Sequence, residues 1–189
     1  MKKWIIIPVL TVIILFTACG HKVTVADLQV RIDSLQTALD TFTTHKAKTD
    51  AQLLMIDSAD YKYYDMQQWD RFSLSHSPDV RVFYPDGGLS VGLPQHIDML
   101  KPMFEFAPDT KIFQHRTSFG SNDWTTVIQE IQGTFTDTLK LPTGKTYLPT
   151  GKQFMFLMCT VAHWKDGKMM DKYLFWDNEA FMKQIGVIQ

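Results

Sequence analysis

The stretch that decides the fold is FMFLMCTVAHWKDGKMMDKYLFW, residues 154–176. Two apolar runs, Phe154 to Trp164 and Met169 to Trp176, flank the dipeptide Asp166-Gly167. Asp-Gly between two such runs is typical of a tight β-hairpin turn, in which both central residues adopt a positive φ. The sequence therefore predicts a long antiparallel hairpin near its C-terminal end.

The polar residues of this hairpin and of the segment after it raise the question of an active site. With a turn of two or three residues, Asp177 lies opposite residues 155–157, roughly 20–26 Å from His163 at the usual strand rise. The two side chains are then too far apart to share a proton. We interpret His163 as a rim or surface residue, and Asp177 as the cap of a final helix that Gly186 ends. The alternative is that they are catalytic.

The elements before the hairpin predict an α+β fold with helices on one face of a mixed or antiparallel sheet. Hydrophobic periodicity and turn residues indicate helices over 50–75 and 94–106, and strands over 80–84, 111–118 and 124–135. Residues 137–153 read as a loop.

Composition and histidine spacing argue against two classes of partner. The chain has 189 residues, is 45% hydrophobic and carries a formal net charge of −1. Without a basic excess, nothing drives binding to a nucleic-acid backbone. The 6 histidines are scattered, with no pair at a spacing typical of metal ligands. We therefore expect no nucleic acid and no metal.

The first residues predict an export signal of the lipoprotein type, residues 1–18. A positive start precedes a nearly unbroken apolar run, Trp4 to Phe16, which is too short to span a bilayer comfortably. The run ends in Thr17-Ala18-Cys19, which resembles a bacterial lipobox. The resemblance implies lipid on Cys19 and anchoring at a periplasmic or outer membrane of the bacterial cell envelope. The alternatives are an uncleaved anchor and an ordinary signal.

Residues 19–48 are predicted to form a helical stalk or spacer. Apolar side chains recur alternately three and four residues apart, which is the pattern of a coiled-coil seam. They are Val25, Leu28, Ile32, Leu35, Leu39 and Phe42. This seam predicts either a short coiled coil that joins two copies or an amphipathic helix that packs on the domain of residues 49–189.

Several short motifs together resemble one family over about residues 50 to 187. They occur in the order His76-Ser77-Pro78-Asp79-Val80, Pro85-Asp86-Gly87, Ala107-Pro108-Asp109, Gly133-Thr134-Phe135, Pro149-Thr150-Gly151-Lys152, Asp166-Gly167-Lys168 and Gln184-Ile185-Gly186. The combination resembles the SnoaL-like polyketide cyclase family, also called ester cyclase. The resemblance implies a nuclear transport factor 2-like cone, a curved sheet wrapped against helices around one pocket. It also implies cofactor-independent acid–base chemistry on an apolar substrate.

The residues at the catalytic positions of that family differ here. Aligned on the Asp166-Gly167-Lys168 turn, the family's catalytic aspartate falls on Leu174 and its partnering histidine on Thr160. Neither side chain is a proton-transfer group near neutral pH. The resemblance therefore implies a cavity that has lost its carboxylate–imidazole pair.

Strand alternation predicts what lines the cavity instead. If positions 160 and 174 face inward, a mostly apolar set faces inward with them. The predicted ligand pocket is Phe154, Phe156, Met158, Thr160, Ala162, Trp164, Lys172, Leu174 and Trp176. Lys172 could have a lowered pKa among these apolar residues. Glu130 is the candidate for a relocated catalytic base, with an outer-face position as the alternative.

These observations favour an envelope lipoprotein whose domain binds a small, largely apolar molecule without the family's aldol chemistry. Two alternatives stay open. One is a cofactor-independent cyclase, isomerase or hydratase with a relocated acid/base residue. The other is an interaction module that forms a homodimer through the outer face of the sheet and the helical stalk.

Overall fold

The computed structural model describes residues 23–141 and 144–189. The predicted signal peptide and Cys19 lie outside the described residues. The chain divides into two compact units, Met1–Leu39 and Asp40–Gln189. Helix α1, Val25–Ser58, crosses the boundary between them. In the part of the chain that is described, every helix is too short or too polar to cross a membrane.

The described part of the first unit is the start of α1. Thr24 and Asp27 cap it reciprocally: the Thr24 amide donates to Asp27 Oδ2 at 2.9 Å, and the Asp27 amide donates to Thr24 Oγ1 at 3.2 Å. The seam side chains within the helix are exposed, with 48% for Leu28 and 70% for Leu35. Pairing of this seam with a second copy stays a prediction.

The second unit is built on a six-stranded sheet in the order β2-β1-β8-β7-β4-β3. All neighbouring strands are antiparallel except β1 and β8, which are parallel. The strands are β1 His76–Phe83, β2 Leu89–Val91, β3 Lys111–Ser121, β4 Trp124–Thr134, β7 Gln153–Lys165 and β8 Lys168–Phe175. A separate small pair is β5 Leu139–Lys140 with β6 Thr146–Tyr147.

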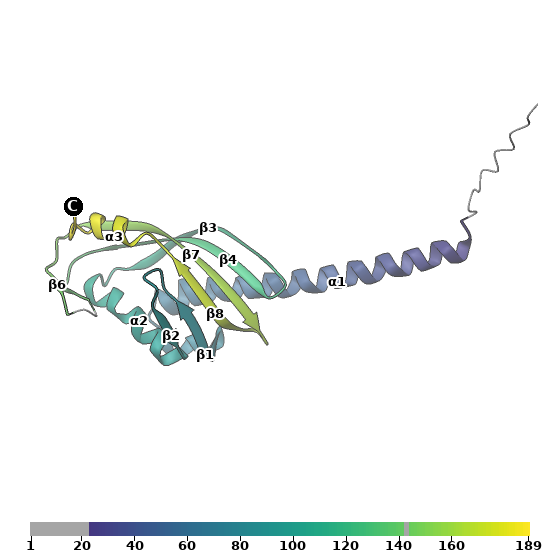
Figure 1. Ribbon diagram of the computed structural model, residues 1–189, viewed down its shortest axis with the longest axis horizontal. Helices are drawn as coiled ribbons and strands as arrows, with labels where there is room; N and C mark the ends of the chain where they lie inside the picture. Colours follow the sequence, from purple (N-terminus) through teal and green to yellow (C-terminus); the bar gives the residue numbers. More distant parts are fainter. Residues whose placement is uncertain (1–22, 142–143) are drawn as a thin grey trace, which may run out of the picture. The chain divides into compact units, whose positions relative to one another are not determined.

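The predicted hairpin is confirmed as β7 and β8. Asp166 and Gly167 adopt φ values of 50° and 75°, the left-handed conformation that a tight turn of this type requires. In the resulting register Thr160 lies opposite Leu174, and His163 lies opposite Asp171. Figure 1 shows the long strands β3, β4 and β7 side by side in one curved layer.

The predicted helix over 50–75 is divided into three pieces. After α1 ends at Ser58, the chain widens into a π-helix, η1 Ala59–Tyr64, and then forms a 3₁₀-helix, η2 Trp69–Leu74. Helix α2 spans Leu93–Phe106, and α3 spans Asn178–Gln184. The cap predicted for the last helix is confirmed, because Asp177 Oδ1 accepts a hydrogen bond from the Ala180 amide at 2.9 Å.

The core lies between the concave face of the sheet and these helices. One cluster of buried side chains joins η1, η2, α2 and α3 to strands β3, β4 and β7, and includes Tyr64, Phe104, Phe154 and Phe181. A second cluster joins Ile56 of α1 to Val127, Ala162 and Trp164 of the sheet. This arrangement of helices around a curved sheet confirms the predicted α+β cone.

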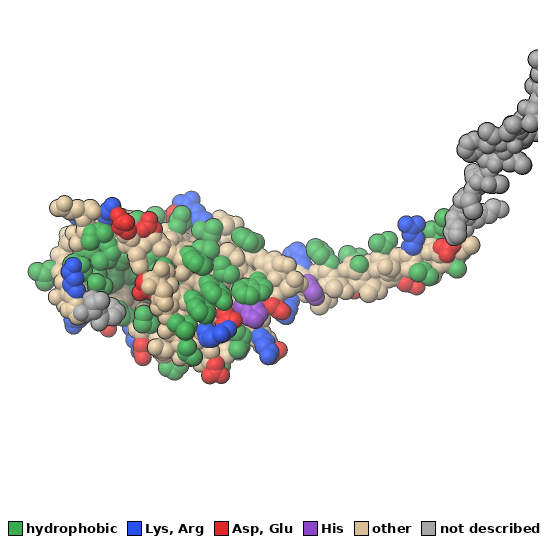
Figure 2. All heavy atoms as spheres, viewed as in Figure 1, with side chains coloured by type: hydrophobic (Ala, Val, Ile, Leu, Met, Phe, Trp, Pro, Cys, Tyr) green, Lys and Arg blue, Asp and Glu red, His purple; other side chains and the backbone are tan. Residues whose placement is uncertain are grey.

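The opposite face of the sheet is partly apolar and open to solvent. Residues with exposed apolar side chains here include Trp124, Met155, Leu157 and Phe175, which are 44–54% exposed. Figure 2 shows hydrophobic side chains gathered over the region of β7 and β8. We call this surface, Trp124, Met155, Leu157, Phe175 and their neighbours, the outer face.

Candidate functional site

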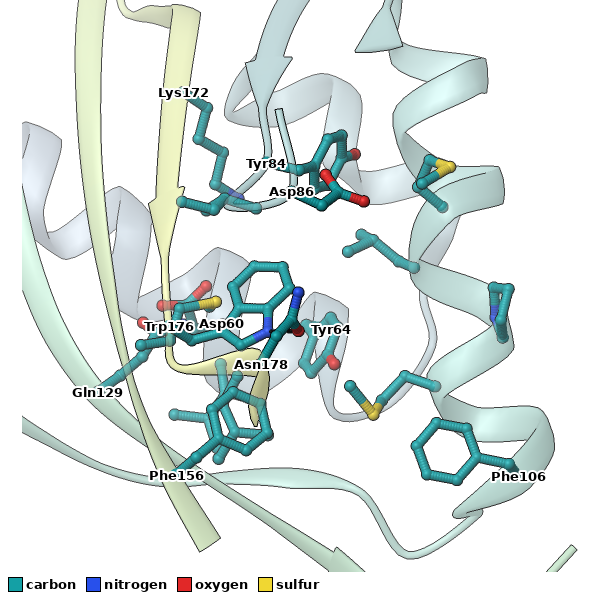
Figure 3. Close-up of a pocket in the computed structure, with 18 of the residues that line it drawn as sticks. Asp60, Tyr64, Tyr84, Asp86, Phe106, Gln129, Phe156, Lys172, Trp176 and Asn178 are labelled. Atoms are coloured by element: carbon teal, nitrogen blue, oxygen red, sulfur yellow. Dashed lines mark hydrogen bonds between the residues drawn. The ribbon is translucent and has the colours of Figure 1, made fainter. Parts of the chain in front are cut away.

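A cavity of about 530 Å³ lies between the concave face of the sheet and the helices of the second unit. That volume is within the range of small-molecule sites. Most of its lining is apolar and comes from α2 and the sheet, including Leu100, Met103, Phe106, Ile131, Phe156 and Leu174 (Figure 3). The cavity can therefore accept a small, largely apolar molecule.

A limited set of polar side chains reaches this lining. They are Asp60, Tyr64, Tyr84, Asp86, Gln129, Lys140, Lys172 and Asn178. The Gln129 Oε1 atom is buried and has no hydrogen-bond partner. Because a buried acceptor without a donor is costly, a hydroxyl or N–H of a bound molecule would satisfy it. Among the described residues, no group of three or more His, Cys, Asp or Glu side chains is arranged to hold a metal ion.

Asp60 is the carboxylate that the π-helix η1 places in the cavity wall. Behind it, on β3, the Nε2 atom of His115 lies 3.1 Å from Asp60 Oδ2. The other ring nitrogen of His115, Nδ1, lies 2.8 Å from Asp57 Oδ1. The His115 backbone amide also donates to the Tyr61 hydroxyl at 2.7 Å. A π-helical turn is a frequent feature of functional sites, and here it holds Asp60 against an imidazole.

The charges of this group favour a protonated imidazole. Burial lowers the pKa of His115, but the hydrogen bond and charge of Asp60, together with those of Asp57, outweigh it and raise the pKa above its ordinary value. The protonated ring donates a hydrogen bond to each carboxylate. His115 therefore fixes the position of Asp60 and leaves the other Asp60 oxygen able to act on a bound molecule.

Lys172 of β8 is a buried amine on the same cavity. Its side chain lines the cavity and is 9% exposed. Burial lowers its pKa, and the charge of Asp60 acts in the opposite direction. Within the described ranges, neither an ion pair nor a hydrogen bond holds its Nζ atom. The Lys172 amine is therefore available to a ligand.

Two buried histidines lie next to this lysine. Tyr84 belongs to the cavity lining, and its hydroxyl lies 3.0 Å from His96 Nδ1 and 3.2 Å from Ser90 Oγ. The rings of His76 and His96 are 5.5 Å apart, and the Nε2 atom of each is buried without a partner. Burial, reinforced by the charge of Lys172, lowers the pKa of both rings well below the ordinary value. Both imidazoles are therefore neutral near pH 7.

Comparison with known proteins agrees with this geometry. The sequence profile of the SnoaL-like polyketide cyclase family matches residues 55–185. The chain belongs to the SnoaL-like polyketide cyclase family. No curated protein is similar enough in sequence to count as a match.

Solved structures of SnoaL-like proteins have the same fold. A proposed SnoaL-like polyketide cyclase from Jannaschia sp. CCS1 is 16% identical, with a TM-score of 0.65 over 75% of this chain and 95% of its own. A proposed polyketide cyclase from Xanthomonas campestris pv. campestris is 12% identical, with a TM-score of 0.64 over 74% and 99%. IdmH from Streptomyces antibioticus, also a proposed polyketide cyclase, is 16% identical, with a TM-score of 0.60 over 71% and 98%.

The structure places five of the nine predicted pocket residues in the lining of the SnoaL-like cavity. They are Phe156, Met158, Lys172, Leu174 and Trp176. The other four are buried elsewhere. Phe154 packs on Phe181 of α3, with ring centroids 5.2 Å apart. Ala162 and Trp164 pack in the second core cluster, and Thr160 is buried outside the lining.

The prediction that Glu130 enters the SnoaL-like cavity is wrong. Its neighbours Gln129 and Ile131 line the cavity, so strand alternation turns Glu130 toward the outer face. There Arg116 forms a short salt bridge with its carboxylate, and Gln114 donates to it at 2.6 Å. These two partners lower the pKa of Glu130, which is the opposite of what a buried base requires.

The expectation of a SnoaL-like cavity without a carboxylate–imidazole pair also needs correction. Thr160 and Leu174 do lie opposite each other and do not ionise. However, Asp60 lines the cavity, and His115 binds it from outside the lining. A titratable pair is therefore present, but on a helix and an outer strand of the SnoaL-like fold instead of on the hairpin.

The acidic residues of the hairpin itself lie away from the cavity. Asp171 pairs with Arg81 at 2.6 Å and with His163 at 3.2 Å, on the outer face. Sequence reasoning missed Asp60, Tyr84 and Gln129. The one local signal was the spacing of Asp57 and Asp60, which places both on one side of a helix. Their partner His115 is 55 residues from Asp60 in the SnoaL-like sequence, and no pattern connects the two.

Proposed function

We propose that this domain binds a small, largely apolar carbonyl compound and that Asp60 transfers a proton on it. The observation that carries the proposal is the position of Asp60, which lines an apolar cavity while His115 holds it from behind. The family's aldol pair is replaced here by Leu174 and Thr160, so the chemistry of the site has moved to Asp60. No metal or cofactor is invoked.

The surroundings of Asp60 suit a general base. An apolar cavity excludes water, which strengthens the action of a charged group on a bound molecule. Asp60 shares the cavity lining with Lys172, Tyr84 and Gln129, which can hold a carbonyl or enol oxygen. In this arrangement the carboxylate removes a proton from the carbon next to the carbonyl, and the polar groups stabilise the resulting enol.

Exchange of α-protons tests this proposal. The purified full chain is incubated with 2-tetralone, an apolar cyclic ketone fused to an aromatic ring, in D₂O, and loss of its α-proton signals is followed by NMR. We expect Asp60→Asn to slow the enzyme-dependent exchange by about 100-fold or more. Glu130→Gln, which changes a carboxylate on the outer face, is the matched control and should keep the rate within about twofold. If Asp60→Asn and the wild type exchanged the α-protons at equal rates, Asp60 would be excluded as the proton-transfer group.

A binding function without turnover has a different signature in the same experiment. Saturable binding of 2-tetralone, seen as chemical-shift changes for residues such as Phe156 and Leu174, with exchange no faster than in buffer, would identify a binding domain. Absence of both binding and exchange would contradict the whole proposal for this ketone class.

We also propose that the chain is held at a bacterial envelope membrane by lipid on Cys19. The support comes from the sequence, in which an apolar run is followed by Thr17-Ala18-Cys19. Several acyl chains on one residue anchor a protein stably. Mass spectrometry of the protein from the membrane fraction should find acyl chains on Cys19. Cys19→Ser should move the protein out of that fraction, and membrane retention of this variant would reject the proposal.

A homodimer through the outer face is a second candidate, favoured by exposed Trp124, Leu157 and Phe175. This surface also carries ion pairs of both signs, Arg81 with Asp171 and Arg116 with Glu130, which a copy related by a twofold axis could match. Sedimentation should show a dimer that Leu157→Lys disrupts. Leu35→Lys tests the coiled-coil seam separately. A monomeric wild type would contradict dimer formation through either the outer face or the seam.

A further inference from the structure

The proposed function uses Lys172 only as a polar group that can hold a carbonyl or enol oxygen, although its position in the cavity allows more. The side chain extends from β8 into the cavity and is 9% exposed. The structure, within 23–141 and 144–189, gives its Nζ atom no salt bridge and no hydrogen bond. Lys165, on the same hairpin, is by contrast exposed to solvent. An unpaired buried lysine is costly to keep charged, because nothing replaces the water that an ammonium loses.

Burial favours the neutral amine of Lys172, and among the surrounding groups only the charge of Asp60 opposes it. Asp60 faces it from η1 and is already engaged by His115. His76 of β1 and His96 of α2 are neutral, so they do not balance a positive charge. Tyr84 and Asp86 complete the titratable groups of the lining near the lysine (Figure 3). Burial lowers the lysine's pKa, which increases the fraction of free amine near neutral pH. A desolvated neutral amine is a nucleophile.

We propose that the Nζ atom of Lys172 forms an imine with an aldehyde or ketone bound in the cavity. This inference rests on the proposed function, because it assumes that the cavity accepts an apolar carbonyl compound. It adds a covalent step and narrows the ligand to molecules with an unhindered carbonyl group. The cavity wall around the lysine, with Met158, Leu174 and Trp176, matches an aromatic or aliphatic body next to that carbonyl.

The step balances without an oxidant or reductant. The Nζ lone pair forms a bond to the carbonyl carbon, and the C=O π electrons move to oxygen, which takes a proton from the Tyr84 hydroxyl. An amine proton passes to the Asp60 carboxylate and restores a neutral carbinolamine. Asp60 then returns this proton to the hydroxyl group, which leaves as water while the C=N bond forms. Tyr84 regains its proton from the iminium nitrogen, and addition of water reverses the reaction.

The imine also gives Asp60 a stronger substrate. Before Tyr84 takes the proton from its nitrogen, the iminium C=N group withdraws more electron density than C=O, so the neighbouring C–H is more acidic at that stage. The same carboxylate can then remove that proton and generate an enamine, the carbon nucleophile of an aldol-type reaction. Lys172 and Asp60 lie close enough for their charges to interact, which is what this division of roles requires.

Reductive trapping tests the imine directly. The full chain at pH 7 is treated with benzaldehyde and sodium cyanoborohydride, which reduces an iminium to a stable benzylamine, and each lysine is quantified by peptide mass spectrometry. We expect Lys172 to be benzylated at least about tenfold faster than Lys165. Lys172→Arg, which keeps a long basic side chain but cannot form an imine, should leave the labelling of Lys165 unchanged and abolish the fast phase.

The outcomes separate this inference from the proposed function. Labelling of Lys172 no faster than that of Lys165 overturns the imine. If Asp60→Asn still slows exchange of 2-tetralone in that case, the proposed function stands, and Lys172 only holds the oxygen of the bound ketone without forming a covalent bond. If Lys172 is benzylated rapidly while Asp60→Asn exchanges normally, the imine stands and the assignment of Asp60 fails.

Discussion

The Nε2 atom of His115 lies 3.1 Å from the Oδ2 atom of Asp60, although the two residues are 55 positions apart in the chain. Their contact turns one wall of an apolar cavity into a site with a fixed carboxylate. The imidazole is anchored from its other nitrogen by Asp57, so the ring cannot rotate away without breaking two interactions. His115 is a positioning residue, since it reaches the cavity only through Asp60.

The titration of His115 tests this relationship. Its folded pKa is raised, so its contribution to stability is fully present below the unfolded pKa of about 6.5 and is lost as pH rises through the folded value. We expect its ring to titrate above 6.5 in NMR spectra and Asp60→Asn to lower that pKa. A His115 pKa that Asp60→Asn leaves unchanged would contradict the assignment.

The buried histidines His76 and His96 should make the domain sensitive to acid. Burial lowers their folded pKa values well below 6.5, so the unfolded chain binds more protons as pH falls. Each ring should therefore cost up to about 2 kcal/mol of stability between pH 6.5 and pH 5. Urea unfolding at several pH values gives the free energy of unfolding of the wild type and of His76→Gln. The stability of the variant should depend less on pH. Parallel pH profiles would refute the prediction.

Asp65 should destabilise the folded state at neutral pH. Burial raises its pKa to about 6, even though the Ile112 amide donates to its carboxylate. The protonated carboxyl is tolerated in the folded state at low pH. As pH rises toward the folded pKa of about 6, the carboxyl ionises and the folded state loses stability. Asp65→Asn keeps an acceptor for Ile112 and carries no charge. We expect it to raise the free energy of unfolding at pH 7.5 by about 1 kcal/mol, with solvent screening taken into account, and to have little effect below the ordinary carboxyl pKa of 3.8.

The cap of the last helix should contribute measurably to stability. Removing the Asp177 carboxylate leaves the Ala180 amide without its acceptor. Asp177→Ala should cost about 1 kcal/mol in thermal or urea unfolding, whereas Asp177→Ser should keep most of the stability. Because the Asp177 side chain is outside the cavity lining, although Trp176 and Asn178 belong to it, exchange of 2-tetralone should be unaffected. If folded Asp177→Ala no longer catalysed the exchange, Asp177 would have to be assigned a role in the active site.

The sequence predicted the hairpin, its Asp166-Gly167 turn and the cap at Asp177 because each depends on neighbouring residues. Alternation along a strand divides side chains into two faces but does not say which face is inner. On β4 each of the two faces carries polar residues, so the sequence alone indicates Glu130 as readily as Gln129. In the structure Gln129 lines the cavity. The Asp60–His115 contact depends on a π-helix and on the packing of a distant strand, neither of which has a local signal.

The parallel pairing of β1 with β8 has a consequence for how the domain assembles. β8 lies between β1 and β7, and Arg81 of β1 binds Asp171 of β8 across 90 positions of sequence. The sheet therefore has a gap at its centre until almost the whole chain has been synthesised. Contacts this distant in sequence form slowly. We expect a nascent chain that ends before Lys168 to stay open and protease-sensitive, and completion of folding to wait for the last twenty or so residues.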